Sequence, residues 1–155
     1  MRLRRDAKVR LLEQVPLFHG CTDAELARVA RLVRAVVSYD DGSTLMYEGA
    51  RGDEFLLMVE GRATVRIQDQ EMSSLRPGDY LGEIALLNQS PRTATVVAEG
   101  RVRALVLDEQ AFATMLDEVP AVRPRVTRTA LDRLAQKPGR ADDRADDRAD
   151  DRADH

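Results

Sequence analysis

A chain of 155 residues with 43% hydrophobic residues is long enough for one domain with a hydrophobic core. Its formal net charge of −3 gives it no general attraction to nucleic acid. No apolar run approaches the roughly 18 residues that cross a bilayer, and no signal-peptide core follows the basic first ten residues. These properties predict a cytoplasmic protein without a membrane anchor.

The side chains that hold metals or act as nucleophiles are scarce. Cys21 is the single cysteine of the chain, which excludes an intramolecular disulfide and favours a small buried side chain over a reactive thiol. The histidines, His19 and His155, are far apart, and neither has a companion at metal-ligand spacing. We therefore predict no metal site, no catalytic cofactor and no enzyme activity. A cupin-like metal jelly roll, in particular, needs a histidine cluster.

Two helices are predicted at the start of the chain. Residues 1–14 have the pattern of a short helix. Thr22 and Glu25 then form a capping box, which predicts the start of a second helix. The apolar residues that follow recur at helical spacing, and they predict a helix that ends near residue 36. These residues are Leu26, Val29, Ala30, Val33, Val36 and Val37.

From Val36 to Asp108 the pattern changes to short β-branched or alternating runs separated by glycine turns. Short strands with a turn every ~8–12 residues are typical of a β-sandwich or β-barrel. In residues 62–68, apolar and polar side chains alternate, which predicts a strand with one face toward water. The predicted strands are Thr44–Tyr47, Phe55–Val59, Arg62–Gln68, Thr93–Ala98 and Val102–Leu107, and the turns lie at Gly42, Gly49, Gly61 and Gly78.

Residues 83–87 interrupt the β pattern with good helix formers. They predict a helix of little more than one turn, between Gly82 and the turn that ends at Pro91. The first N–H groups of such a helix have no partner within it. A helix start of this kind favours a phosphate group, although most short helices bind nothing.

Two further helices and a tail complete the chain. Asp108 is predicted to cap the first helix, and Pro120 separates it from the last one. Proline is tolerated only in a helix's first turn, so Pro124 predicts that the regular part of the last helix starts near Arg123. Residues 138–155 repeat Arg-Ala-Asp-Asp, which places like charges four residues apart. We expect a mostly disordered tail there, with a charged helix as the alternative.

Residues 78–98 resemble the phosphate-binding cassette of cyclic nucleotide-binding domains. This family includes the catabolite activator protein, the regulatory subunits of cyclic nucleotide-dependent kinases and the nucleotide-gated channels. Its cassette reads Gly-Glu-hydrophobic-Ala-Leu, a variable turn, and then Pro-Arg-x-Ala-Thr-Val. The chain matches it with Gly82-Glu83-Ile84-Ala85-Leu86 and Pro91-Arg92-Thr93-Ala94-Thr95-Val96. The resemblance covers residues 10–136 and implies a cyclic nucleotide-binding domain in residues 1–137.

The family resemblance also implies a fold. We expect a mainly β protein, a β-roll of the double-stranded jelly-roll type. N-terminal helices precede the roll, a short cassette helix interrupts it, and two C-terminal helices follow it.

The resemblance assigns roles to the cassette residues. Arg92 would bind the phosphate, because a guanidinium forks onto two oxygens in a way that lysine does not. Glu83 would accept a hydrogen bond from the ribose 2′-hydroxyl. Taken singly, each of these two charged residues is more often an ordinary surface side chain. The implied ligand-binding set is Gly82, Glu83, Ile84, Ala85, Arg92, Thr93 and Ala94, with backbone N–H groups near Ile84, Ala85 and Ala94 around the phosphate.

The resemblance is less specific about the base. We expect cAMP ahead of cGMP, because cAMP is the commoner ligand among bacterial members. Threonine at the position of Thr93 accompanies a cGMP preference in the kinase branches of the family, and an ordinary strand residue is the other interpretation. The last helix of the family covers the base, which would bring Arg133 or Lys137 to the purine. Solvated helix charges are the alternative for both residues.

The predicted function is a small cyclic nucleotide receptor or regulatory module that signals by movement of its C-terminal helix. An unidentified effector protein would receive the signal. The acidic repeat replaces the helix-turn-helix domain of the family's transcription factors, so we expect no direct DNA binding. The apolar positions of the last helix allow a monomer or a weak homodimer. The alternative is an interaction or structural module with the same fold that no longer binds nucleotide.

Overall fold

The computed structural model describes residues 5–138, so the predicted tail lies almost wholly outside the described residues. In chain order, the helices and strands are α1 (Arg5–Glu13), the 3-10 turn η1 (Pro16–Phe18), α2 (Asp23–Leu32), β1 (Ala35–Tyr39), β2 (Thr44–Met46), β3 (Glu54–Ile67), β4 (Gln70–Leu75), β5 (Tyr80–Leu81), α3 (Glu83–Asn88), β6 (Thr95–Asp108), α4 (Glu109–Glu118) and α5 (Val122–Ala135).

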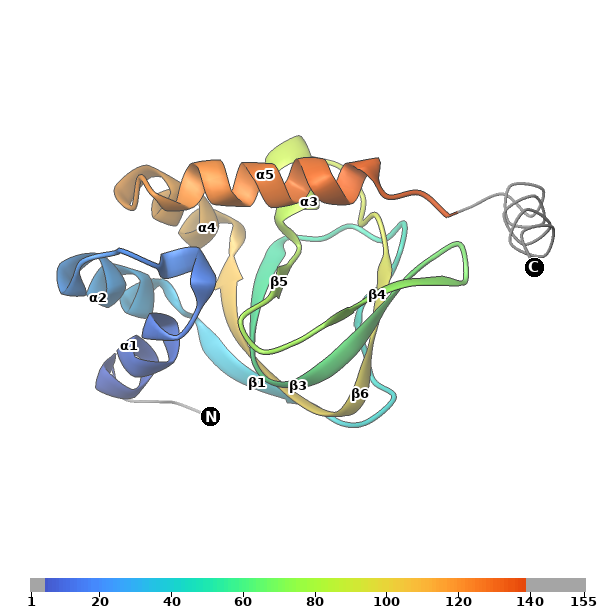
Figure 1. The fold of residues 1–155 in the computed structure, drawn as a ribbon, viewed down its shortest axis with the longest axis horizontal. Coiled ribbons are helices and arrows are strands. Elements are labelled where there is room, and N and C mark those ends of the chain that lie inside the picture. Colours follow the sequence, from blue (N-terminus) through green and yellow to red (C-terminus); the bar gives the residue numbers. More distant parts are fainter. Residues whose placement is uncertain (1–4, 139–155) are drawn as a thin grey trace, which may run out of the picture.

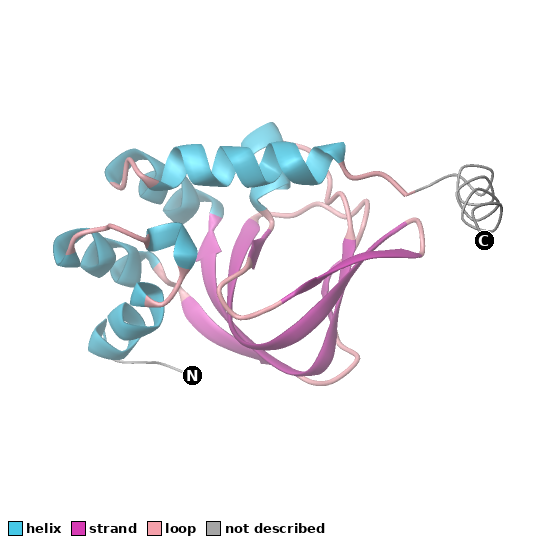
Figure 2. Ribbon diagram, in the orientation of Figure 1, coloured by secondary structure: helices cyan, strands magenta, loops and turns pink. Residues whose placement is uncertain are grey.

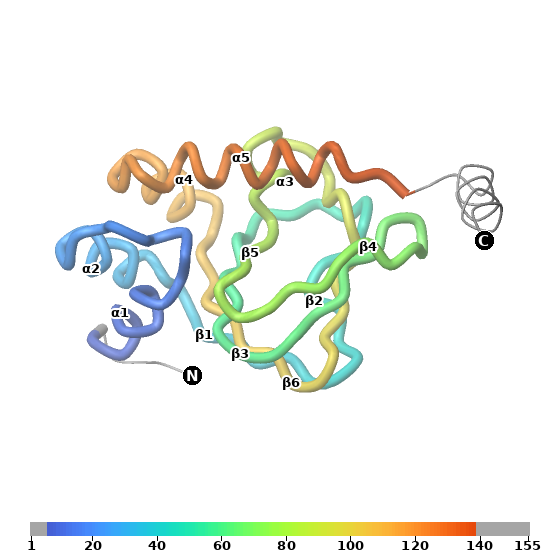
Figure 3. The backbone as a smooth tube through the Cα atoms, viewed as in Figure 1, coloured from blue at the N-terminus to red at the C-terminus, as the bar shows by residue number. Residues whose placement is uncertain are grey.

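The strands form one curved antiparallel sheet in the order β1-β6-β3-β4, with β2 paired to β6 and β5 paired to β3. The helices gather beside this roll, and α5 extends across one end of it (Figure 1, Figure 2). The tube in Figure 3 shows the chain turning from β5 into α3, which passes behind α5 in this view. This arrangement confirms the predicted β-roll with N-terminal helices, a cassette helix and two C-terminal helices. None of the described helices has the length and hydropathy needed to cross a bilayer.

The capping box is confirmed, but the predicted end of its helix is wrong. Thr22 Oγ1 accepts from the Glu25 amide at 3.1 Å, and Glu25 Oε1 accepts from the Thr22 amide at 2.9 Å. The helix α2 ends at Leu32, and Val36 is already part of β1, where it pairs with Leu105. Val36 and Val37, which suggested a longer helix, lie in this strand instead, Val36 buried and Val37 half-buried, since β-branched side chains pack well on a pleated sheet.

The long strands β3 and β6 were each predicted as two short ones. The residues Glu60-Gly61 form no turn; they lie in a bulge where the pairing register of β3 with β6 shifts. Gly61 has φ +91°, and a β-carbon there would lie 2.2 Å from the carbonyl oxygen of Arg101. Glycine therefore lets β3 bend close to β6 without breaking. The strand β4 was missed because its sequence, with two serines, a glutamine and a glutamate, lacks the β-branched residues that indicate strands.

Alternate residues of β3 point into two different apolar clusters, as the period of a strand requires. Phe55 and Leu57 pack toward the helices, where the Phe55 ring lies 4.9 Å from that of Phe112 and 5.3 Å from that of Tyr80. Leu56 and Met58 point into the roll. The first cluster packs the helices against the roll, and the second fills part of the interior of the roll.

We predict that Gly61→Ala destabilises the fold more than an ordinary glycine substitution. Left-handed backbone costs a residue with a β-carbon about 1–2 kcal/mol. At Gly61, a clash with the neighbouring strand's backbone adds to this loss. Urea denaturation should therefore show a larger loss for Gly61→Ala than for Gly42→Ala, whose φ is +81° but whose β-carbon meets nothing within 4 Å. Equal losses would contradict this account of the bulge.

Candidate functional site

A cavity opens into the roll between α3, the interior of the sheet and the end of α5. It contains about 520 Å³ of space not filled by atoms, part of it open to solvent. Most of its wall is apolar, with a few polar groups from the cassette and from α5. The apolar wall consists of Met46, Val65, Ile67, Leu75, Leu81 and Val96, beside Ile84, Ala85 and Ala94 of the cassette.

All seven residues that the cassette resemblance assigned to the ligand line this cavity. The predicted short helix is confirmed as α3, and Gly82 precedes it in a left-handed conformation, φ +99°. A β-carbon at Gly82 would lie 2.4 Å from the carbonyl oxygen of Glu54 and 2.7 Å from Arg92 Nη1. Glycine is therefore required at this position for the backbone conformation and for the close approach of β3 and the arginine.

The side chain of Arg92 is buried, with 9% of the residue exposed. Its Nη2 donates to the Glu54 carbonyl oxygen at 3.0 Å, whereas its Nη1 is buried and has no partner among the described residues. The backbone is fixed as well, because the Arg92 amide donates to Ala50 O and its carbonyl accepts from the Gly49 amide, both at 2.8 Å. Burial lowers the pKa of the Arg92 guanidinium, and the charge of Glu54 opposes this shift.

Gly52 makes the room that the guanidinium of Arg92 occupies. A β-carbon at this position would lie 1.9 Å from Arg92 Nε, whereas the Gly52 backbone lies outside the left-handed region. The contact with Arg92, and not the backbone conformation, therefore excludes a larger residue. The sequence indicated Gly52 only as part of a turn, because the approach of a side chain 40 positions later leaves no local signal.

The carboxylate of Glu83 is the second buried charge of the cavity, with 1% of its side chain exposed. A single nitrogen of Arg133, Nη1, donates to Glu83 Oε1 at 2.6 Å and to Oε2 at 2.9 Å. Burial raises the pKa of the Glu83 carboxyl, and the charge of Arg133 opposes the shift. The two residues form an ion pair between the cassette and the last helix, which the sequence did not predict.

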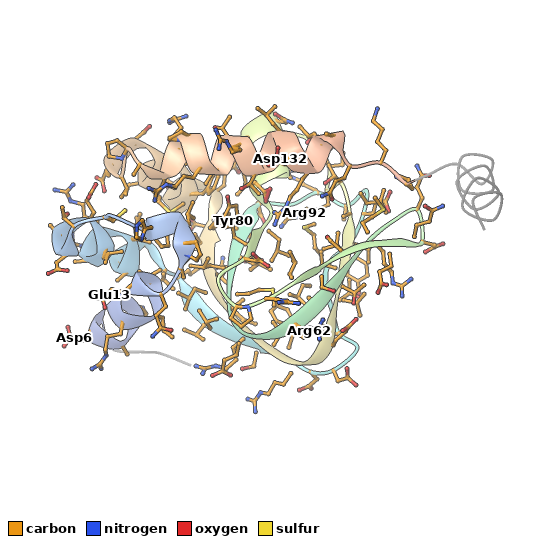
Figure 4. The ribbon with its side chains drawn as sticks, viewed as in Figure 1. Asp6, Glu13, Arg62, Tyr80, Arg92 and Asp132 are labelled. Carbon is orange, nitrogen blue, oxygen red and sulfur yellow. The ribbon has the colours of Figure 1, made fainter. Side chains whose placement is uncertain are left out.

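Tyr80 links the same helix to the sheet. The guanidinium of Arg133 lies over its ring, 5.5 Å from the centroid, within reach of a cation–π interaction. The Tyr80 hydroxyl donates to Thr129 Oγ1 at 2.6 Å, and Thr129 Oγ1 donates to the Arg125 carbonyl at 3.1 Å. Figure 4 shows Tyr80 and Arg92 beneath α5. The helix is therefore held over the cavity by contacts to β5 and to α3.

The predicted residues of the last helix differ in their positions. Arg133 lines the cavity, where its side chain contacts Glu83. Lys137 is exposed and is not part of the cavity wall. Gln136, the residue that follows α5, lines the cavity instead, together with Ser73 from β4. Sequence reasoning missed both. Ser73 alternates with Leu75 on one face of a strand that was not recognised, and Gln136 is one helical turn beyond Arg133.

Comparison with known proteins identifies the same family that the cassette resembles. The sequence pattern of the family described as "Cyclic nucleotide-binding domain" matches residues 36–119. The cAMP-dependent protein kinase regulatory subunit of Mycosarcoma maydis is 37% identical over 131 residues, covering 79% of this chain and 25% of that protein. This chain thus spans about a quarter of that relative's length.

Two solved structures have the same fold. The regulatory domain of Toxoplasma gondii PKA, crystallised with cAMP, superposes with a TM-score of 0.75 at 27% identity over 83% of this chain and 50% of that one. The Thermus thermophilus catabolite activator protein gives a TM-score of 0.69 at 26% identity over 77% and 58%. The matched pattern extends over more than half of the sequence and includes the whole cassette. This chain belongs to the cyclic nucleotide-binding domain family.

Proposed function

We propose that the chain binds a cyclic nucleotide in this cavity, cAMP in preference to cGMP, and acts as a regulatory module and not as an enzyme. The buried guanidinium of Arg92, with its unpaired Nη1, is the observation that carries this proposal. A buried donor left without a partner destabilises a fold by about 1–3 kcal/mol, so an acceptor that enters the cavity is favoured. The single negative charge of a cyclic phosphate diester fits this donor.

The phosphate is assigned to the end of the cavity where Arg92 meets the start of α3. Nη1 of Arg92 has no protein partner that a phosphate oxygen would have to displace, while Nη2 stays on the Glu54 carbonyl. The backbone amides near Ile84, Ala85 and Ala94 border the same cavity and complete the proposed phosphate contacts. Gly82 allows the close approach of the backbone.

The ribose is assigned to Glu83, whose carboxylate is the one acidic group on the cavity wall among the described residues. A carboxylate accepts a charge-assisted hydrogen bond from the 2′-hydroxyl, which distinguishes ribose from deoxyribose. Thr93 is then placed near the base. The T. gondii neighbour contains cAMP, which supports cAMP as the ligand of this chain, with cGMP as the alternative.

The output is assigned to α5, which carries Arg133 on the cavity wall and ends three residues before the described chain does. Differential affinity of the nucleotide for two positions of this helix would shift their populations. Since the relatives are kinase regulatory subunits, a protein kinase is the kind of effector that we propose. We place the binding domain in residues 1–137, as a monomer or weak homodimer, in a cytoplasmic protein.

A second function is favoured by the Glu83–Arg133 ion pair. In this structure the carboxylate that would bind ribose is already engaged by the chain itself. A chain that has lost its ligand would retain such a pair as a structural contact. The alternative is therefore an interaction module with the same fold that binds no nucleotide.

We predict that Arg92→Ala weakens cAMP binding by roughly ten- to a hundredfold, because a hydrogen bond to a charged group contributes about 1.5–3 kcal/mol. Calorimetric titration of the full chain with cAMP and with cGMP measures this change. Arg66→Ala is the matched control, since Arg66 is exposed on the outer face of β3. Absence of heat with both nucleotides at millimolar concentration would refute the nucleotide proposal and leave the interaction module.

We predict that Gly52→Ala also weakens cAMP binding, although it changes no group that touches the ligand. The new β-carbon occupies the position of Arg92 Nε and displaces the guanidinium. Loss of the hydrogen bond that the displaced guanidinium would donate, about 1.5–3 kcal/mol for a charged group, corresponds to roughly ten- to a hundredfold weaker binding. The same titration, with Gly42→Ala as the control far from the cavity, checks this. Unchanged binding by Gly52→Ala would show that Arg92 does not hold the phosphate in this position.

We predict that Thr93→Ala lowers the affinity for cGMP and leaves that for cAMP almost unchanged. Thr93 lines the cavity. Its hydroxyl can accept from the 2-amino group of guanine, which adenine lacks. Loss of one neutral hydrogen bond of about 0.5–1.5 kcal/mol corresponds to a two- to tenfold weaker affinity. Competition titrations measure the ratio, with Thr95→Ala as the control, since Thr95 bonds the Glu48 amide instead. An equal change in affinity for both nucleotides would show that Thr93 does not distinguish the bases.

A further inference from the structure

The carboxylate of Glu83 is inaccessible in this structure. Its side chain is 1% exposed, although the residue borders a cavity that is open to solvent. The Arg133 guanidinium is bonded to it, with Nη1 donating to both carboxylate oxygens. A hydroxyl group that enters the cavity therefore meets a carboxylate whose two oxygens already have a donor within the chain.

We propose that Arg133 competes with the ribose 2′-hydroxyl of the nucleotide for Glu83, and thereby sets how strongly the protein prefers ribonucleotides to 2′-deoxyribonucleotides. This inference rests on the proposed function of the cavity. The phosphate site carries no such competitor, because Arg92 Nη1 is unpaired among the described residues. The chain thus opposes recognition of the ribose and leaves recognition of the phosphate unopposed.

The competition follows from the hydrogen-bonding capacity of the groups. An ionised carboxylate is an acceptor only, and a buried one needs donors to compensate the loss of water. In the ligand-free chain Arg133 supplies two donated bonds and a positive charge. A 2′-hydroxyl supplies one donated bond and no charge. The hydrogen bond to ribose therefore contributes to affinity only what remains after the ion pair is broken.

The position of Arg133 is set by the rest of α5. Thr129, one turn earlier, is bonded to the Tyr80 hydroxyl at 2.6 Å, and the Arg133 guanidinium lies over the Tyr80 ring. Arg133 is also the basic residue of the last helical turn, where the helix dipole favours a positive charge. Release of the guanidinium from Glu83 therefore removes one of the contacts that hold the end of α5 on the cassette.

A 2′-deoxy nucleotide lacks the group that needs Glu83, so its binding leaves the ion pair intact. The test compares cAMP with 2′-deoxy-cAMP on the full chain, by calorimetry, for wild type and for Arg133→Gln. Removal of the competitor lets the hydroxyl bond contribute in full, about 1.5–3 kcal/mol for a charged acceptor. The ratio that we compare is the dissociation constant of 2′-deoxy-cAMP divided by that of cAMP. We expect this ratio to increase in Arg133→Gln, on the order of tenfold, because cAMP binding tightens.

Two further variants make the comparison specific. Arg128→Gln removes the same charge from an exposed position of the same helix, and it should leave the ratio at its wild-type value. Glu83→Ala removes the shared acceptor, and it leaves no unpaired buried carboxylate when Arg133→Gln is added. In the Glu83→Ala background, adding Arg133→Gln should therefore not change the ratio.

The outcomes separate the two proposals. A ratio that stays constant or falls in Arg133→Gln, while wild type binds cAMP, overturns the competition and leaves the proposed function standing. Equal weakening of both nucleotides in Arg133→Gln overturns it as well, because Arg133 would then hold the ligand. Absence of binding by wild type removes the proposed function and this inference together.

Discussion

A buried guanidinium with an unpaired nitrogen is the feature on which the rest of the site depends. Arg92 Nη1 lies inside the protein without a partner among residues 5–138, which destabilises the fold by about 1–3 kcal/mol until an acceptor arrives. The surrounding backbone holds the group in place nonetheless. Gly52 and Gly82 leave the space that the guanidinium fills, and the Glu54 carbonyl accepts from Nη2. The cavity therefore borders a buried donor without a partner, and most of its other walls are apolar.

The sequence predicted the class of the fold well and the lengths of its strands poorly. Turn residues and alternating runs are local signals, and they correctly indicated a mainly β domain with flanking helices. Gly61 was interpreted as a turn because a bulge and a turn both favour glycine. The bulge is recognised only from the neighbouring strand, where the Arg101 carbonyl would lie 2.2 Å from a β-carbon added at Gly61. That contact joins distant parts of the chain, as does the pairing that makes Val36 part of a strand.

The residues of the cavity also divide into those with a local sequence signal and those without one. The cassette is a local motif, so its seven residues were predicted together, and all line the cavity. Gly52, Ser73 and Gln136 come from three other segments and were missed. The Glu83–Arg133 ion pair spans 50 positions, and nothing local to either residue indicates it. The family resemblance placed Arg133 over the base, while the structure without ligand places it on the carboxylate.

The two buried charges of the cavity are therefore not equivalent. Glu83 has a partner within the chain, so its burial is compensated whether or not a ligand is present. Arg92 has only a carbonyl on one nitrogen, and its remaining donor needs something that the described chain does not supply. A purely structural role would explain the first arrangement, because ion pairs between two helices are common contacts. It does not explain the second, because an unpaired buried donor weakens a structure that has no ligand to accept from it.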